Sequence, residues 1–220
     1  MTALQLVQQQ ERSLDSYVIL PGSSRRGQEY PDLLASQNRD YFGKNWYETH
    51  EALAREGSFM LTPRQFFDFV LVLDSGKRIY NGNGRLVDSS VKTIILDKIM
   101  AKRDSWRVEW LDAYFVEKEG RLYMQSSHTR LADGRLVPMT SEPLEKCLMT
   151  NCYTDLRNIN RQGLPIKESK KHEIYFWHPA NGRVSWFGVN SVRAGLVCDR
   201  DARYSGAGLG VRPSKIFHKQ

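Results

Sequence analysis

The hydrophobic period of this chain changes near residue 105, from about 3.6 residues, typical of amphipathic helices, to about 2, typical of strands. The strongest helix signal is Thr62-Pro63-Arg64-Gln65, a capping box with proline at the first helical position. The apolar residues that follow keep helical spacing as far as Gly76. Because helices come first and strands later, the order favours the α+β class over alternating βαβ units.

Two further helices are expected before residue 105. Thr49 is the expected N-cap of the first, which ends at Gly57. Asp88 or Ser89 caps the second, which continues to about Lys102. The apolar face of this second helix is formed by Ile94, Ile95, Leu96 and Ile99.

After residue 105, two turn signals predict β-hairpins. Asp133-Gly134 and Asn181-Gly182 each lie between two runs of strand-forming residues, and such steps are the strongest short-range hairpin signal. Between them, a short helix that carries two of the cysteines is expected near Pro143–Thr150. A chain of 220 residues can bury a sizeable core, so a single domain over residues 1–220 is predicted, with residues 1–45 as an N-terminal extension.

The net charge of +7 belongs entirely to the last 60 residues. Residues 161–220 hold 11 Lys/Arg and 4 Asp/Glu, whereas residues 1–160 are neutral. A basic segment ordinarily indicates nucleic-acid binding. Here Asp199 and Asp201 interrupt the cations, so a nucleic-acid-binding domain, which would bind less tightly as salt rises, is kept as an alternative function.

Motifs for metal binding or catalysis are absent from the sequence. Cys147 and Cys152 are separated by four residues, with no second Cys or His pair to complete a zinc site. His50 stands beside Glu48 and Glu51 and is expected in a cluster on a helix surface. No HExxH, GxSxG or phosphate-binding loop occurs. The sequence therefore predicts no metal, no catalytic residue and no enzyme.

No apolar run in the sequence approaches the roughly 18 residues of a membrane-spanning helix. The first 15 residues lack the basic, apolar and small-residue regions of a secretory signal. No membrane span is therefore expected, and the location is left undetermined between the cytoplasm, as the default, and export by an unrecognised route.

Residues 193–204 show the clearest alternation in the chain. Ala194, Leu196 and Cys198 form a small or apolar row suited to a core, while the residues between them mix cations, anions, glycine and valine. Periodicity alone indicates a half-buried strand with one solvated face. It predicts that Leu196→Asp unfolds the protein and that Val197→Asp does not.

The same region lacks certain residue types. From Phe187 to Ser214 there is no Lys, Glu, Gln, Met or Trp, although these five types together make up 45 of the 220 residues. None of these five can be reached from an asparagine codon by replacing its adenines. Adenine-directed mutagenesis of asparagine codons would therefore explain the bias.

Three features of this region occur together: Trp186-Phe187, the alternation that ends at Tyr204-Ser205, and the closing Leu209-Gly210-Val211-Arg212. In these features the chain resembles the variable proteins of diversity-generating retroelements, in particular the archaeal, nanoarchaeal-type branch. In that family a reverse transcriptase copies a template repeat with adenine-specific errors and overwrites the 3′ end of the gene. Members display the varied residues on a C-type lectin fold, at a ligand-binding face.

The resemblance implies a C-type lectin-like α+β fold whose variable segment spans about residues 184–212. Trp186, Phe187, Leu209 and Val211 would anchor its two ends, and Arg200 and Arg212 would be buried and need acceptor partners. The fixed scaffold would be Ala194, Leu196, Cys198, Arg200, Tyr204, Ser205, Leu209, Gly210, Val211 and Arg212. The diversified, outward-facing and ligand-binding set would be Gly188, Asn190, Val192, Arg193, Gly195, Val197, Asp199, Asp201, Arg203 and Gly206.

The expected ligand is a protein, and no cofactor is expected. Calcium-dependent lectins pair Glu-Pro-Asn with Trp-Asn-Asp, whereas this chain has Glu142-Pro143-Leu144 and no Trp-Asn-Asp, so calcium-dependent sugar binding is not predicted. A second alternative is an enzyme of the formylglycine-generating type, because those enzymes use a C-type lectin-like scaffold and a cysteine pair. Only Cys147 and Cys152 could supply that pair.

Overall fold

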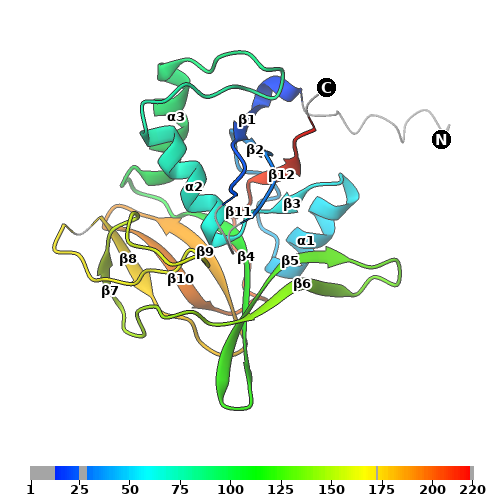
Figure 1. Cartoon of the computed structure of the whole chain (residues 1–220), viewed down its shortest axis with the longest axis vertical. Helices are drawn as coiled ribbons and strands as arrows, with labels where there is room; N and C mark the ends of the chain where they lie inside the picture. Colours follow the sequence, from blue (N-terminus) through cyan, green and yellow to red (C-terminus); the bar gives the residue numbers. More distant parts are fainter. Residues whose placement is uncertain (1–12, 25–28, 172, 219–220) are drawn as a thin grey trace.

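A computed structural model describes residues 13–24, 29–171 and 173–218 of the chain. In these residues it has three α-helices and two mainly antiparallel sheets, so the α+β prediction is confirmed (Figure 1). None of the described helices is long and apolar enough to cross a membrane. The helices are α1 (Trp46–Arg55), α2 (Pro63–Asp74) and α3 (Ser89–Met100).

The smaller sheet joins the two ends of the described chain. Its strand order is β1-β2-β12-β3, and β2 pairs antiparallel with β12. Both β1 and β2 fall in the segment that was expected to be an N-terminal extension, so this part of the segment is integral to the fold. The strands are β1 (Tyr17–Leu20), β2 (Leu33–Ser36), β3 (Phe59–Met60) and β12 (Pro213–Ile216).

The larger sheet has the strand order β6-β5-β4-β9-β10-β8-β7, and the short β11 pairs with β4. The central strands β4, β9 and β10 are antiparallel neighbours, whereas β8 runs parallel to β10. The strands are β4 (Arg107–Lys118), β5 (Arg121–Arg130), β6 (Leu136–Pro143), β7 (Cys152–Thr154), β8 (Ile174–Trp177), β9 (Arg183–Val189), β10 (Ala194–Arg200) and β11 (Leu209–Gly210).

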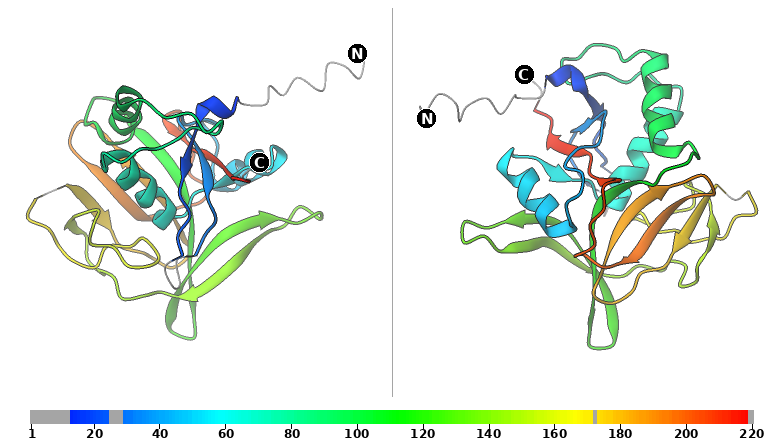
Figure 2. Two further views of the ribbon diagram at one scale, coloured as in Figure 1. Left: turned by 45° about the horizontal axis from the view of Figure 1, so that its top comes forward. Right: turned by 180° about the vertical axis from the view of Figure 1, so that it is seen from behind.

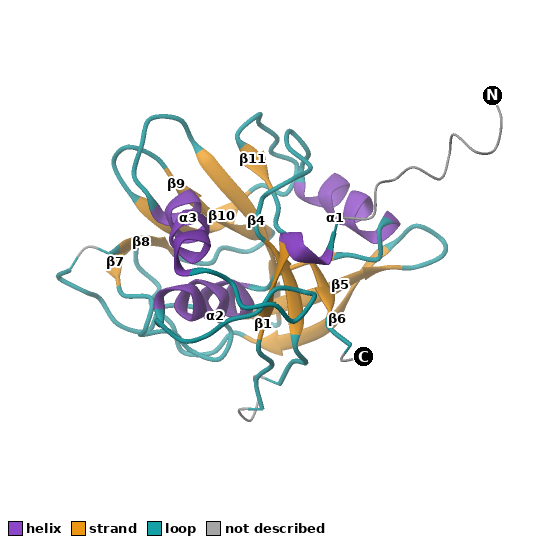
Figure 3. Ribbon diagram, turned by 90° about the horizontal axis from the view of Figure 1, so that it is seen from above, coloured by secondary structure: helices purple, strands orange, loops and turns teal. Residues whose placement is uncertain are grey.

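Other elements pack against both faces of the central strands β4, β9 and β10 of the larger sheet. The first face packs against α2 in the main core, where Phe66 meets Phe187, and α3 packs against α2 in the same core (Figure 3). The second face packs against α1 through a separate cluster that includes Trp46 and Trp186. The chain that leaves β10 returns over this second face before β11 pairs with β4 (Figure 2). Ala202 lies buried in that returning segment, and its carbonyl accepts a hydrogen bond from the backbone N–H of Trp46 at 3.0 Å.

The helix predictions are confirmed for α2 and α3 and corrected for α1. Thr62 and Gln65 form the predicted capping box, and the Asp88 side chain caps α3. In α3, Ile94 is exposed rather than part of the apolar face. The first helix begins four residues before the expected position, because Asn45 forms a capping box with Glu48. Thr49 therefore lies inside α1 and is buried.

The first of the two hairpin predictions is confirmed, since Asp133-Gly134 connects β5 to β6. The Asn181-Gly182 turn forms, but the expected hairpin is wrong, because β8 pairs with β10 and β9 with β4 and β10. The turn is instead hydrogen-bonded to the C-terminal end of β4. The Gly182 N–H donates to the Phe115 carbonyl, and the Asn181 side chain accepts from the Glu117 N–H, both at 2.8 Å.

The short helix expected near residues 143–150 is also wrong. This segment is irregular, and its backbone hydrogen bonds go to other parts of the chain. The Leu144 N–H donates to the Leu122 carbonyl, and the Leu148 N–H donates to the Pro165 carbonyl, each at 2.8 Å. Non-local partners therefore replace the local bonds that a helix would need.

Candidate ligand-binding face

The two rows of β10 are both buried. Ala194, Leu196 and Cys198 belong to the main core on the first face, as the alternation predicted. Val197 points to the second face and is only 1% exposed, in the cluster with Trp186. The expectation that Val197 faces outward is therefore wrong, because α1 and the segment after β10 cover this face.

Gly188 and Gly195 pair with each other across β9 and β10, and both are buried. A Cβ atom on Gly195 would lie 2.4 Å from the Tyr175 carbonyl oxygen and 2.7 Å from Cζ3 of Trp177. On Gly188 it would lie 3.2 Å from Cζ3 of Trp106. The outward-facing expectation is wrong for both glycines. Because neither glycine has a side chain, the Trp106 ring can lie against Gly188 and the Trp177 ring against Gly195.

The other seven positions of the expected ligand-binding set are at least partly accessible. Val192 is 62% exposed at the tip of the β9–β10 hairpin. Asn190, at the same turn, also has a structural role, because its side-chain oxygen accepts the N–H groups of Val192 and Arg193, each at 2.9 Å. Arg193, Asn190, Asp199 and Gly206 are half-buried, and Asp201 and Arg203 are exposed.

Aromatic side chains gather around these positions on the second face. The Arg193 guanidinium lies 4.9 Å from the ring centre of Tyr175 and 5.7 Å from that of Trp177. Tyr204 contacts Trp186 edge-on at 5.4 Å, and Trp106 lies 6.2 Å from the same ring. Trp106 and Tyr204 are each 50% exposed. The aromatic face, as defined here, consists of Trp106, Tyr175, Trp177, Arg193 and Tyr204.

The expected anchors of the variable segment, Trp186, Phe187, Leu209 and Val211, are all buried. Arg212 is 3% exposed and makes two hydrogen bonds to the Glu109 carboxylate, at 2.8 and 3.2 Å. It also donates to the Ser36 carbonyl, so the prediction of acceptor partners is confirmed for this residue. Arg200, in contrast, is half-exposed rather than buried, and it lies over the Trp186 ring at 4.8 Å.

The basic residues of the last 60 positions do not form one patch in the described part of the chain. Lys215 lies on β12, whereas Lys170 and Lys171 lie in the connection between β7 and β8, in separate regions of Figure 1. Arg183 faces Asp201 at 3.6 Å. This distribution adds no support to the nucleic-acid alternative.

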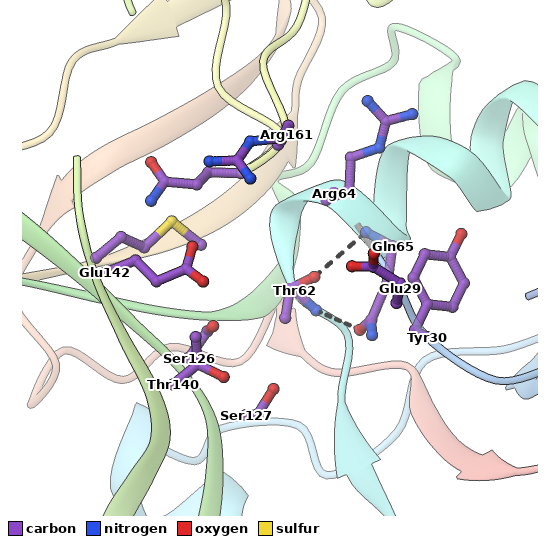
Figure 4. A pocket seen from close by; sticks show the side chains of 12 residues that line it. Glu29, Tyr30, Thr62, Arg64, Gln65, Ser126, Ser127, Thr140, Glu142 and Arg161 are labelled. Carbon is purple, nitrogen blue, oxygen red and sulfur yellow. Dashed lines mark hydrogen bonds between the residues drawn. The ribbon is translucent and has the colours of Figure 1, made fainter. Parts of the chain in front are cut away.

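A polar cavity of about 210 Å³ opens between the start of α2 and the β5–β6 pair (Figure 4). Glu142 and Arg161 line one wall, and the Thr62–Gln65 capping box lines the opposite wall. Arg64 is paired with Asp68, and Arg161 with Glu145. Because its cations are already paired with carboxylates, the cavity does not favour a ligand of one charge.

A buried polar cluster, which no motif in the sequence predicts, lies under α1. His50 on α1, Asp112 on β4 and His128 on β5 bring their ligand atoms within 4.8 Å of one another. Nε2 of His50 lies 3.7 Å from Oδ1 of Asp112, and Nδ1 of His128 lies 2.5 Å from the same oxygen. His50 is 4% exposed, so its expected place on a helix surface is wrong.

The environment of His50 keeps its imidazole neutral. Burial lowers the pKa of His50 to about 4, against the opposing effect of the Asp112 carboxylate. Near pH 7 the ring therefore carries one nitrogen with a free lone pair and one N–H. The cluster is the one group of three or more such residues in the described chain whose geometry could hold a metal ion.

Two sequence signals could have indicated this cluster. The Asn45 capping box sets the register of α1, and it places Trp46, Thr49, His50 and Leu53 on one face by the i, i+3, i+4, i+7 rule. Asp112 also interrupts a row of apolar residues at alternate positions of β4. The contact among His50, Asp112 and His128 joins three elements far apart in the sequence, and no pattern in a single sequence indicates it.

The cysteines bear on the enzyme alternative. All three are free thiols, and Cys198 is buried. Burial raises the pKa of the Cys147 thiol to about 11, and burial followed by Glu168 raises that of Cys152. A raised pKa disfavours the thiolate that a nucleophilic cysteine needs near neutral pH.

We expect Cys147 to react with iodoacetamide at pH 8 about 100-fold more slowly than an unperturbed cysteine, because its thiolate fraction is lower by that factor. The rate is measured at this residue by mass spectrometry, with the chain unfolded in guanidinium as the control. The rate should rise as the pH approaches 11. Equal rates in the folded and unfolded chains at pH 8 would contradict this prediction.

Comparison of the chain with protein-family models, with curated proteins and with solved structures finds no match in any of the three.

Proposed function

We propose that this chain is a non-enzymatic binding protein that recognises protein ligands through its aromatic face and the exposed residues beside it. The proposal includes its origin, as a variable protein of a diversity-generating retroelement with a C-type lectin-like fold. The sequence resemblance and the residue types missing from residues 187–214 motivate the origin. The composition and exposure of the aromatic face support the binding role.

The observation that carries the binding role is the gathering of tryptophan, tyrosine and arginine on an accessible surface. These three residue types are the most enriched among residues that dominate binding energy at protein interfaces. Trp106 and Tyr204 expose half of their surface, although burying them would stabilise the fold. Tyr and Trp give a large contact area at low cost in side-chain entropy, which suits a recognition surface.

Diversification requires that varied side chains leave the core intact. Val192, Asp201 and Arg203 satisfy this condition, because they are exposed. Arg193 and Asp199, at the two ends of β10, are half-buried and satisfy the condition in part, since Oδ1 of Asp199 is buried although its side chain as a whole is 39% exposed. Gly188, Gly195 and Val197 do not satisfy it, so we expect these three positions to vary little among copies of the gene.

The retroelement origin is tested by sequencing the locus and the DNA downstream of it. We expect a near-duplicate of the codons for residues 184–212, with adenines in the codons of the exposed positions. Copies of the gene should differ at Val192, Arg193, Asp199, Asp201 and Arg203. An absent repeat, or substitutions spread equally over the Ala194, Leu196 and Cys198 row, would contradict the origin.

The binding role is tested with two libraries of the full-length chain, displayed on yeast and sorted for protease resistance. The first library randomises the five exposed or half-exposed positions Val192, Arg193, Asp199, Asp201 and Arg203. The matched control randomises the five buried positions Ala194, Gly195, Leu196, Val197 and Cys198. We expect most clones of the first to resist protease and few of the second, because buried substitutions are the costly ones.

The resistant clones of the first library are then selected against a panel of purified, unrelated proteins. Binders that lose affinity when Trp106 or Tyr204 is replaced by alanine would support the proposed face. If the first library loses protease resistance as often as the control, or if binders are unaffected by both alanine changes, the proposed binding face is wrong.

A further inference from the structure

The buried cluster of His50, Asp112 and His128 has no part in the proposed binding face. Its three side chains come from α1, β4 and β5, so they join the second-face helix to the sheet. Their side chains are 4%, 2% and 5% exposed, respectively. Two imidazoles and a carboxylate in a nearly closed space need a structural or chemical reason, because buried polar groups are costly unless they are satisfied.

One atom of the cluster is left unsatisfied. Nε2 of His50 is buried and has no hydrogen-bond partner among the described residues. It points toward Oδ1 of Asp112, but their separation of 3.7 Å is too long for a hydrogen bond. An unpaired nitrogen in a buried imidazole is the observation that indicates a missing ligand.

The three donor atoms are close enough to hold one metal ion after shifts of about 1 to 1.5 Å. A tetrahedral zinc ion with bonds of about 2.0–2.1 Å places its ligand atoms roughly 3.3 Å apart. The His50–Asp112 and Asp112–His128 atoms, at 3.7 and 2.5 Å, differ from that spacing by less than about 1 Å, and the two imidazole nitrogens, which lie within 4.8 Å of each other, would close by up to about 1.5 Å. The 2.5 Å contact is a hydrogen bond, which would open to admit the ion. Two histidines and one carboxylate are a ligand set of zinc and of other divalent transition metals.

The surroundings of the cluster hold these side chains in position. The backbone N–H of His128 donates to Oδ2 of Asp112 at 2.8 Å. This bond fixes the carboxylate and leaves Oδ1 facing both imidazole rings. Ser127, which precedes His128, has a positive φ of 54°, and both the backbone N–H and Nδ1 of His128 contact the same carboxylate. Trp46 packs edge-on against both imidazoles, at 4.2 and 4.9 Å. Such outer contacts orient metal ligands.

We propose that His50, Asp112 and His128 bind one divalent transition-metal ion of the zinc type, through Nε2, Oδ1 and Nδ1. The ion links α1 to β4 and β5 and satisfies the unpaired nitrogen of His50. Three protein ligands leave a fourth position for water. The site is independent of the proposed binding face, so its test does not depend on the protein ligand.

The test uses the full-length Cys147→Ser/Cys152→Ser protein, which removes the two accessible thiols as competing ligands. After dialysis against a chelator, the protein is titrated with zinc chloride by calorimetry and with cobalt(II) by visible absorption. We expect one ion per chain. At free zinc about 100-fold above Kd, the melting temperature should rise by about 5–10 °C.

The matched variants are His50→Gln and His178→Gln. His178 is half-buried and lies near Pro179, outside the cluster, so its variant should bind zinc as the parent does. Loss of the His50 ligand should weaken zinc binding more than about 100-fold, since even outer contacts of a metal site are worth 10- to 100-fold. X-ray absorption of the zinc-loaded parent should show imidazole and oxygen ligands.

Each result decides the proposal. Absence of zinc uptake by the parent, or equal affinity in the two glutamine variants, would overturn it. If His50→Gln does not fold, the X-ray absorption spectrum of the parent decides alone: a sulfur ligand, or a spectrum without imidazole, rejects the site.

Discussion

Replacing Arg212 with methionine is expected to destabilise the protein by about 3–5 kcal/mol, because it leaves the Glu109 carboxylate buried without its partner. The guanidinium now makes two hydrogen bonds to Glu109, a third to the Ser36 carbonyl, and a contact with the Phe69 ring at 5.2 Å. Methionine preserves much of the apolar packing but none of these hydrogen bonds. Urea unfolding followed by circular dichroism measures the change.

The matched control is Arg203→Met, a change of the same type at an exposed position, which should alter stability by less than about 0.5 kcal/mol. A double variant, Arg212→Met/Glu109→Leu, should recover much of the loss, since it removes the unpaired carboxylate as well. If Arg212→Met is as stable as Arg203→Met, the ion pair is not buried in the folded protein.

Val197→Asp is expected to unfold the protein or to destabilise it by more than about 4 kcal/mol, because it buries an unpaired carboxylate. The side chain lies in the cluster formed by α1, β4, β9 and the segment after β10. Leu196→Asp, in the main core on the opposite face of the strand, should have a comparable effect.

The control for Val197 is Val192→Asp, the same substitution at a side chain that is 62% exposed. It should change stability by less than about 0.5 kcal/mol. Thermal unfolding of the three variants measures the difference. A stable Val197→Asp protein would mean that the second face of β10 is open to solvent, and it would restore Val197 to the set of diversified positions.

Local signals in the sequence predicted the local structure well. The Thr62–Gln65 capping box, the Asp88 cap and the Asp133-Gly134 hairpin are each determined by residues a few positions apart. The errors have a common cause. At Asn181-Gly182 the sequence predicted a turn correctly, but the strands before and after it pair with distant partners, which a local pattern does not encode.

The candidate sites show the same division. The resemblance implied a buried Arg212, and a buried guanidinium needs acceptors, whether carboxylate or backbone carbonyl. Its partner Glu109 is 103 residues away and could not be named. The cluster of His50, Asp112 and His128 was missed, since three elements supply one residue each and no motif spacing connects them.

By itself, the sequence determined the α+β class, most of the helices and the division of β10 into two alternating rows. Only the tertiary structure decided that both rows are buried. Alternation sorts side chains onto the two faces of a strand, but the exposure of each face depends on what the rest of the chain places over it. Here α1 and the segment after β10 cover the second face, which leaves the accessible positions at the two ends of β10 and around the aromatic face.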